Sequence, residues 1–141
     1  MDRYMCRAKT KDTNEWIYGY YVKHNTVQIC VATDDPSPKH YIVNDGSACD
    51  WGFEPSLQAT EIDPNTLGRC IDNTDKNGRP IFEGDIVKGK VHLHGGYRVR
   101  KGVIEYYVDA FKMKVANDYK EIPCPREIVG NVHDNPELMG D

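Results

Sequence analysis

Apolar residues recur at alternate positions in short runs along the chain, and no stretch has the period of a long amphipathic helix. The alternation is clear where Phe111, Met113 and Val115 are separated by Lys112 and Lys114. Alternation of this kind is typical of strands with one buried and one solvated face. The sequence therefore predicts a mostly β protein that contains short helical turns only.

The predicted strands are short and are bounded by turn residues. The first two form a hairpin, because two runs of the same aromatic and β-branched composition flank Lys23-His24-Asn25. Between residues 48 and 60 the pattern is irregular, and we predict no element there. The strands predicted outside the hairpin of residues 87–101 are residues 16–22, 26–32, 40–43, 103–108, 111–115 and 127–132.

Residues 75–87 contain two successive turns followed by a strand. Asn77-Gly78 is the dipeptide that most readily takes positive φ at two successive positions, and Pro80 excludes a helix beyond it. Residues 83–85 predict a second reversal, after which a β-branched strand begins. This order predicts a small, partly open, SH3-like barrel in the C-terminal half of the chain.

A seam between two lobes is predicted at residues 63–68, which are rich in turn residues. Pro64 also favours an extended conformation at Asp63. We therefore predict one compact, two-lobed unit, with a hairpin-rich lobe at residues 1–66 and the barrel lobe at residues 67–141. At the other end of the chain, Pro136 predicts a short helical turn capped by Asn135.

In the first strand of the hairpin around Gly95 and Gly96, apolar and basic residues alternate, so one face of the strand is apolar and the other is basic. A loop of two residues would place Arg98 and Arg100 on the face of Leu93, whereas a three-residue loop at residues 95–97 pairs Leu93 with Val99. We therefore predict an odd loop that keeps the two faces separate. The residues of the first arm that share the basic parity are Lys88, Lys90, His92 and His94.

Composition excludes disorder and gives no global attraction to polyanions. Nine Tyr, two Trp and three Phe in 141 residues supply large apolar side chains despite a mean hydropathy of -0.67. The net charge is -4, so binding to nucleic acid would require a local basic surface.

The cysteines and the N-terminal residues bear on the cellular compartment. The five cysteines are odd in number, scattered and never spaced as C-x-x-C, which argues against a disulfide framework and a zinc ribbon. Residues 1–4 have no apolar signal region, and no long apolar run follows. We therefore expect a soluble, cytoplasmic protein with reduced thiols and no membrane partner.

Four motifs in the chain are similar to those of a known family. They are residues 66–68 (TLG), 75–78 (DKNG), 81–87 (IFEGDIV) and 128–138 (IVGNVHDNPEL). In their order and spacing they resemble the YopX family of bacteriophage and prophage proteins. The sequence departs from the family pattern at Asp72, where a glycine is usual, and at Arg69, where a glutamine is usual. The resemblance implies a mostly β fold, a phage or bacterial-host origin and homo-oligomers, and it supplies no catalytic residues.

Three patterns resemble metal-binding or catalytic sites, but ordinary turns and solvated side chains explain them better. Residues 73–78 resemble half of a calcium loop, but position 84, where the bidentate glutamate is needed, is a glycine. His92 and His94 have ligand spacing without a third ligand, so we expect solvated histidines, no metal and no cofactor. Glu83, Asp85 or His92 could serve an enzyme acting on nucleic acid or nucleotides, but acids at a strand entry are more often turn formers.

The basic run in the C-terminal half is the clearest functional signal. No acidic residue lies between Asp85 and Glu105. On the predicted register most of the basic side chains converge on one exposed face, as a phosphate-binding surface requires. The alternative is a solvated strand face that resists edge pairing. The candidate nucleic-acid-binding residues are Lys88, Lys90, His92, His94, Arg98, Arg100 and Lys101.

Two functions therefore compete, and an enzyme acting on nucleic acid or nucleotides is a less favoured third. The first is a non-enzymatic phage or prophage accessory protein that assembles into homo-oligomers, in keeping with the resemblance and with the surplus of aromatic side chains. The second is a weak, sequence-independent nucleic-acid-binding module.

Overall fold

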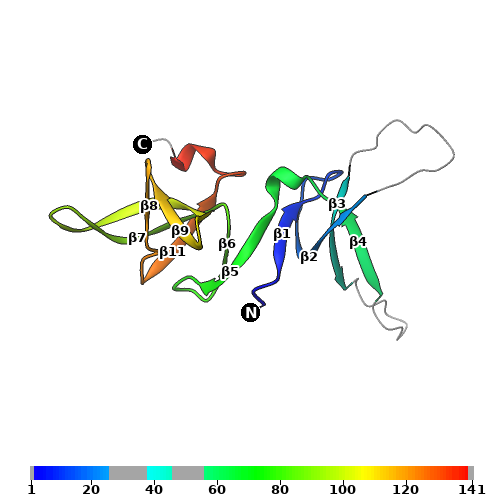
Figure 1. The fold of residues 1–141 in the computed structure, drawn as a ribbon, viewed down its shortest axis with the longest axis horizontal. Helices are drawn as coiled ribbons and strands as arrows, with labels where there is room; N and C mark the ends of the chain where they lie inside the picture. Colours follow the sequence, from blue (N-terminus) through cyan, green and yellow to red (C-terminus); the bar gives the residue numbers. More distant parts are fainter. Residues whose placement is uncertain (1, 26–37, 46–55, 140–141) are drawn as a thin grey trace. The chain divides into compact units, whose positions relative to one another are not determined.

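The computed structural model describes residues 2–25, 38–45 and 56–139, and it confirms the mostly β prediction. The chain divides into two compact units, Tyr4–Leu67 and Gly68–Asp141, the latter together with Met1–Arg3. We call these the N-terminal unit and the C-terminal unit (Figure 1). The predicted strand at residues 26–32 lies outside the described residues. No helix of the described chain is long and apolar enough to span a membrane.

The N-terminal unit contains a four-stranded antiparallel sheet in the order β4-β3-β2-β1. Its aromatic strand β2 is central, because its first half pairs with β1 and its second half pairs with β3. The elements of this unit are β1 (Cys6–Lys9), β2 (Trp16–His24), β3 (Lys39–Asp45), β4 (Leu57–Glu61) and the 3-10 turn η1 (Pro64–Thr66).

The two faces of this sheet differ in burial. One face carries a core that includes Ala8, Ile42 and Ile62, all with at most 1% of their surface exposed. Alternate residues of β2 point to the other face, where Tyr18 and Tyr20 remain nearly half exposed. The aromatic run of β2 therefore forms an exposed apolar surface as well as a strand.

Strand β4 overlaps residues 57–60 of the stretch for which the sequence predicted no element, so that prediction was wrong there, while residues 48–55 lie outside the described residues. Its first three residues are exposed, and the strand pairs only with β3 within its unit. A strand without a buried face needs no alternation of apolar residues, so its sequence carries no strand pattern.

The C-terminal unit contains a five-stranded antiparallel sheet and a two-stranded hairpin. The sheet order is β10-β9-β8-β7-β11. The strands of the hairpin are β5 (Gly68–Thr74) and β6 (Pro80–Phe82). The remaining elements are β7 (Asp85–Leu93), β8 (Gly96–Tyr107), β9 (Ala110–Val115), β10 (Asp118–Lys120), β11 (Arg126–Asn131) and the 3-10 turn η2 (Pro136–Met139).

The core of the C-terminal unit lies between the sheet and the β5–β6 hairpin. Ile81 from β6 packs with Val87, Ile104 and Met113 from the sheet, and all four side chains are fully buried. Strands β10 and β11 lie at the two edges of the sheet, and the described strands form no closed barrel. The more specific expectation of an SH3-like barrel stays a prediction.

The register of the β7–β8 hairpin contradicts the predicted odd loop. Leu93 pairs with Gly96 and Val91 pairs with Arg98, so the two residues His94 and Gly95 form the loop. Gly95 and Gly96 have φ values of 96° and 127°, which suit a tight reversal. Alternation fixes register only where one face is buried. Arg98 lies on the same face as the buried Val91, but it is exposed, so the expected cost of burying its charge does not arise.

The predicted turn at residues 75–79 is present, but its detailed geometry differs from the prediction. Only Gly78 has a positive φ, 81°, whereas two successive positive values were expected. The carboxylate of Asp75 fixes the turn by accepting hydrogen bonds from the backbone N–H groups of Asn77 and Arg79, each at 2.9 Å. An aspartate side chain thus substitutes for the second unusual backbone conformation.

The short helical turn predicted at Pro136 is confirmed, but Asn135 does not cap it through its side chain. The Oδ1 atom of Asn135 accepts a hydrogen bond from the backbone N–H of Asn131, at 3.3 Å. Its backbone carbonyl accepts the N–H of Leu138 instead. The side chain therefore ties η2 to the end of β11.

Val108 is strained and offers a direct test of the β8–β9 turn. It was predicted to continue the strand, yet it lies in the turn with φ of 61° and 79% of its surface exposed. This conformation is unfavourable for a β-branched residue and is tolerated by asparagine. We expect Val108→Asn to raise the free energy of unfolding by about 1 kcal/mol in urea denaturation.

The matched control is Val22→Asn, because Val22 is also exposed but lies within a strand. That variant should be neutral or destabilising, since asparagine is disfavoured in strands. A loss of stability in Val108→Asn would show that the packing of the valine outweighs its backbone strain.

Candidate nucleic-acid interface

The candidate basic residues lie on the hairpin of residues 88–101, which we call the ribbon. Strand β11 pairs with β7 only as far as Gly89, and β9 pairs with β8 only from Val103 onward. Among the described residues, the strands therefore have only each other as neighbours from Lys90 to the loop and back. Figure 1 shows this hairpin extending away from the other strands of its unit.

The observed register divides the basic residues between the two faces of the ribbon. Arg98 and Arg100 lie opposite Val91 and Gly89, on the parity that faces the core farther along the sheet. The opposite face carries Lys88, Lys90, His92 and Lys101. His94 lies in the loop. The predicted convergence on one face is therefore wrong, although all seven residues are exposed.

The five Lys and Arg residues of the ribbon have no carboxylate partner among the described residues. Glu127 lies across from Lys88 in the register, but its carboxylate pairs with Lys76 at 2.9 Å. The other described cations of the C-terminal unit all have polar or aromatic partners. Five pair with carboxylates, namely Arg69, Lys76, Arg79, Lys112 and Lys120, while Arg126 binds backbone carbonyls and Lys114 lies over the ring of Tyr119. Within residues 68–139, the Lys and Arg residues without a polar or aromatic partner among the described residues are therefore those of the ribbon.

The two histidines do not form part of a metal cluster among the described residues. The described chain contains no group of three or more His, Cys, Asp or Glu residues placed to hold a metal ion. The ring of His92 instead meets the ring of Tyr97 edge to face, with centroids 5.2 Å apart. His92 therefore packs against its cross-strand neighbour at the end of the ribbon.

The residues considered for an enzyme are not brought together. Asp85 is 2% exposed, and its Oδ2 atom accepts the backbone N–H of Phe82 at 2.9 Å, which fixes the turn before β7. Glu83 binds the guanidinium group of Arg69. His92 lies seven residues farther along β7 than Asp85, about 23 Å at the usual rise of a strand. His92 therefore does not share one centre with Asp85.

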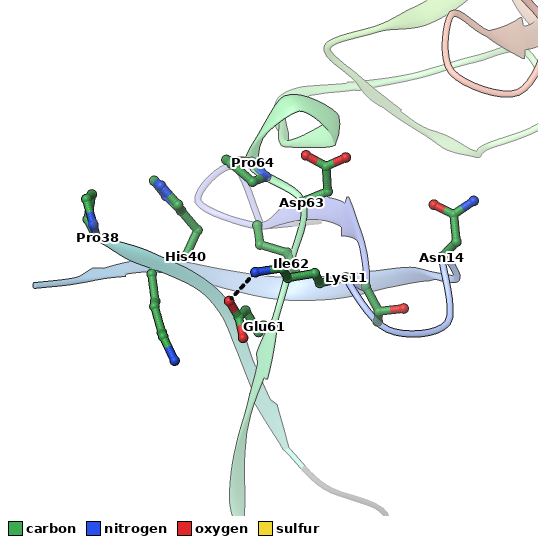
Figure 2. A pocket seen from close by; sticks show the side chains of 10 residues that line it. Lys11, Asn14, Pro38, His40, Glu61, Ile62, Asp63 and Pro64 are labelled. Carbon is green, nitrogen blue, oxygen red and sulfur yellow. Dashed lines mark hydrogen bonds and ion pairs between the residues drawn. The ribbon is translucent and has the colours of Figure 1, made fainter. Parts of the chain in front are cut away.

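The N-terminal unit contains a cavity that no sequence pattern predicted. It has a volume of about 540 Å³, and Lys11, Lys39, His40 and Glu61 are among the residues that line it (Figure 2). Lys11 and Glu61 form an ion pair of 3.1 Å across 50 residues of sequence. Local sequence patterns do not reveal such a site, because its residues come from segments that meet only in the folded sheet.

Comparison with known proteins identifies the family. The family profile described as YopX protein matches residues 6–140, which is nearly the whole chain. The chain belongs to the YopX family. The resemblance carried by the four sequence motifs is thereby confirmed.

Among solved structures, the YopX chain is similar to the protein EF1440 from Enterococcus faecalis. The two share 19% sequence identity with a TM-score of 0.50, and the match covers 95% of this chain and 96% of the other. At this identity the likeness concerns the fold alone. No curated protein matches the YopX chain.

The two departures from the usual YopX pattern have structural accounts. Asp72 has a φ of 59°, so it retains the left-handed conformation that a glycine takes easily, and the β5–β6 register shifts around it. Arg69 binds Glu83 and places its guanidinium carbon 4.8 Å from the ring centre of Tyr106. Both substitutions are thus accommodated within the same hairpin.

Proposed function

We propose that this YopX protein is a non-enzymatic accessory protein of a phage or prophage that binds duplex nucleic acid through the ribbon, without sequence preference, in the cytoplasm of the bacterial host. The observation that supports this most is the group of five cations without carboxylate partners on a two-stranded ribbon. Contacts to phosphates supply most of the affinity in sequence-independent binding.

The distribution of charge over both faces favours a groove over a flat surface. The major groove of B-form DNA admits a two-stranded β-ribbon, and phosphates line both of its walls. A ribbon inserted there would present Arg98 and Arg100 to one wall and Lys90 and Lys101 to the other. The exposed ring of Tyr97, at the end of the ribbon, would enter first.

Fluorescence anisotropy with a labelled duplex oligonucleotide tests this proposal. If all five cations neutralise phosphates, the logarithm of the association constant should fall with the logarithm of salt concentration with a slope of about -4.5. Oligonucleotides of unrelated sequence should bind equally well. No binding at low salt would contradict the proposal.

A second candidate function is self-assembly, which the exposed face of β2 favours. Tyr18, Tyr20 and Val22 occupy alternate positions there, each between 44% and 48% exposed. Exposed apolar rows of this kind often mark protein interfaces. Light scattering should show a mass that exceeds one chain and that falls in a Tyr18→Ser, Tyr20→Ser variant. A strict monomer at all concentrations would exclude a homo-oligomer.

A further inference from the structure

A second cavity lies beside the base of the ribbon, within the C-terminal unit. It has a volume of about 550 Å³, within the usual range for small-molecule sites. Its lining comes from three parts of the sequence: the ribbon, the end of β9 with the residue after it, and η2. The lining residues used below are Lys88, Arg100, Lys101, Val99, Val115 and Met139.

The charged residues in the described lining of this cavity are all basic. Lys88 and Lys101 lie directly opposite each other in the register, an arrangement that like charges disfavour. Neither lysine, nor Arg100, has a carboxylate partner among the described residues, and no acidic residue is found in the described lining. Positive groups gathered in a concave site concentrate the field and attract anions.

The same cavity has an apolar wall that is not fully covered. Val99 is 48% exposed and Met139 is 38% exposed, whereas Val115 also lines the cavity but packs against the core. Exposed apolar side chains beside unpaired cations suit a ligand that has an anionic group and an apolar body. A phosphate monoester matches the two lysines, because its dianion can meet both of them, whereas the side chain of Arg100 lies on the other face of the ribbon.

We propose that this cavity binds a small phosphate monoester with an apolar or aromatic body. Lys88 and Lys101 hold the phosphate group, and Val99 and Met139 contact the body. This site does not depend on the binding of duplex nucleic acid, because η2 and β9 lie outside the ribbon. The two ligands would nevertheless share two cations, so a bound phosphate monoester would compete with the duplex.

Isothermal titration calorimetry on the full chain with 1-naphthyl phosphate tests the site. We expect 1-naphthyl phosphate to bind more tightly than inorganic phosphate and than 1-naphthol, because only the first satisfies both halves of the cavity. Lys101→Met should weaken its binding about fivefold, the effect expected for one partly exposed charge contact. Equal affinity for 1-naphthyl phosphate and 1-naphthol, or no change in Lys101→Met, would overturn the proposal.

The matched control is Lys90→Met, which removes the same charge from the same strand but does not line this cavity. It should keep its affinity for 1-naphthyl phosphate while it weakens duplex binding. Met139→Ser should weaken the binding of 1-naphthyl phosphate and leave duplex binding unchanged, since Met139 lies outside the ribbon. Equal loss of 1-naphthyl phosphate affinity in Lys90→Met and Lys101→Met would show general charge attraction and would also overturn the proposal.

Discussion

Replacing Asp75 with alanine is expected to lower the free energy of unfolding by about 3 kcal/mol, because buried donors would lose their acceptor. The Asp75 side chain has no exposed surface. Besides the two N–H groups of its own turn, it accepts the backbone N–H of Ile128 at 3.3 Å and the guanidinium group of Arg79 at 3.1 Å. Chemical denaturation of parent and variant measures the difference.

The contribution of Asp75 should also depend on pH in a defined direction. Burial raises the pKa of this carboxyl group, but the hydrogen bonds from Arg79, Ile128 and Asn77 outweigh burial and leave the pKa below its ordinary value of 3.8. The unfolded chain therefore binds the proton more readily than the folded chain. The stabilisation is complete above pH 3.8 and is lost as pH falls through the lower, folded-state pKa.

Asp118→Ala is the control for this prediction. Asp118 also has a lowered pKa, owing first to its hydrogen bond with Lys120, but its side chain is 67% exposed. Removing it should leave the denaturation midpoint unchanged within error, because exposed ion pairs contribute little. If Asp75→Ala were as stable as the parent, the carboxylate would not hold the turn.

The second large effect concerns the two faces of the ribbon. We expect Arg98→Gln, Arg100→Gln to lower duplex affinity about 100-fold in 50 mM salt, because each phosphate contact contributes about a factor of ten there. Lys90→Gln, Lys101→Gln, on the other face, should cause a similar loss. Each pair should also reduce the slope of the salt dependence by about two contacts.

Lys23→Gln, Lys39→Gln is the matched control, since it removes two exposed charges from the N-terminal unit. It should retain the affinity of the parent. A loss in only one of the two ribbon pairs would contradict insertion into a groove and indicate binding along a single face. If all three variants bound the duplex as tightly as the parent, the ribbon would be excluded as the interface.

The strands that could be predicted from the sequence are those whose alternation meets a buried face. In β9, Met113 is fully buried while Lys112 and Lys114 on either side are only partly buried. This difference in burial matches the alternation of apolar and charged residues from which the strand was predicted. The register of the ribbon was predicted wrongly by the same reasoning. Both faces of its free end are exposed to solvent, so no cost of burying charge selects one register. The exposed strand β4 left no pattern for a similar reason.

The candidate site was predictable in composition but not in arrangement. The absence of acidic residues around the ribbon is a property of the sequence, and all seven candidate residues are exposed. Their division between two faces depends on a register that the sequence left undetermined. The cavity beside the ribbon joins Lys88 to Met139, and no local pattern connects residues so far apart.

The contacts between the turn at residues 75–79 and β11 bear on the order in which the chain can fold during synthesis. Arg79 donates to the carbonyl of Ile128, the N–H of Lys76 donates to the carbonyl of Arg126, and Arg126 donates back to the carbonyl of Thr74. These bonds span about fifty residues, so the middle turn emerges from the ribosome long before its partners exist. The C-terminal unit can therefore reach its final state only after β11 has been synthesised. Until then, the turn at residues 75–79 lacks these partners and is exposed to solvent.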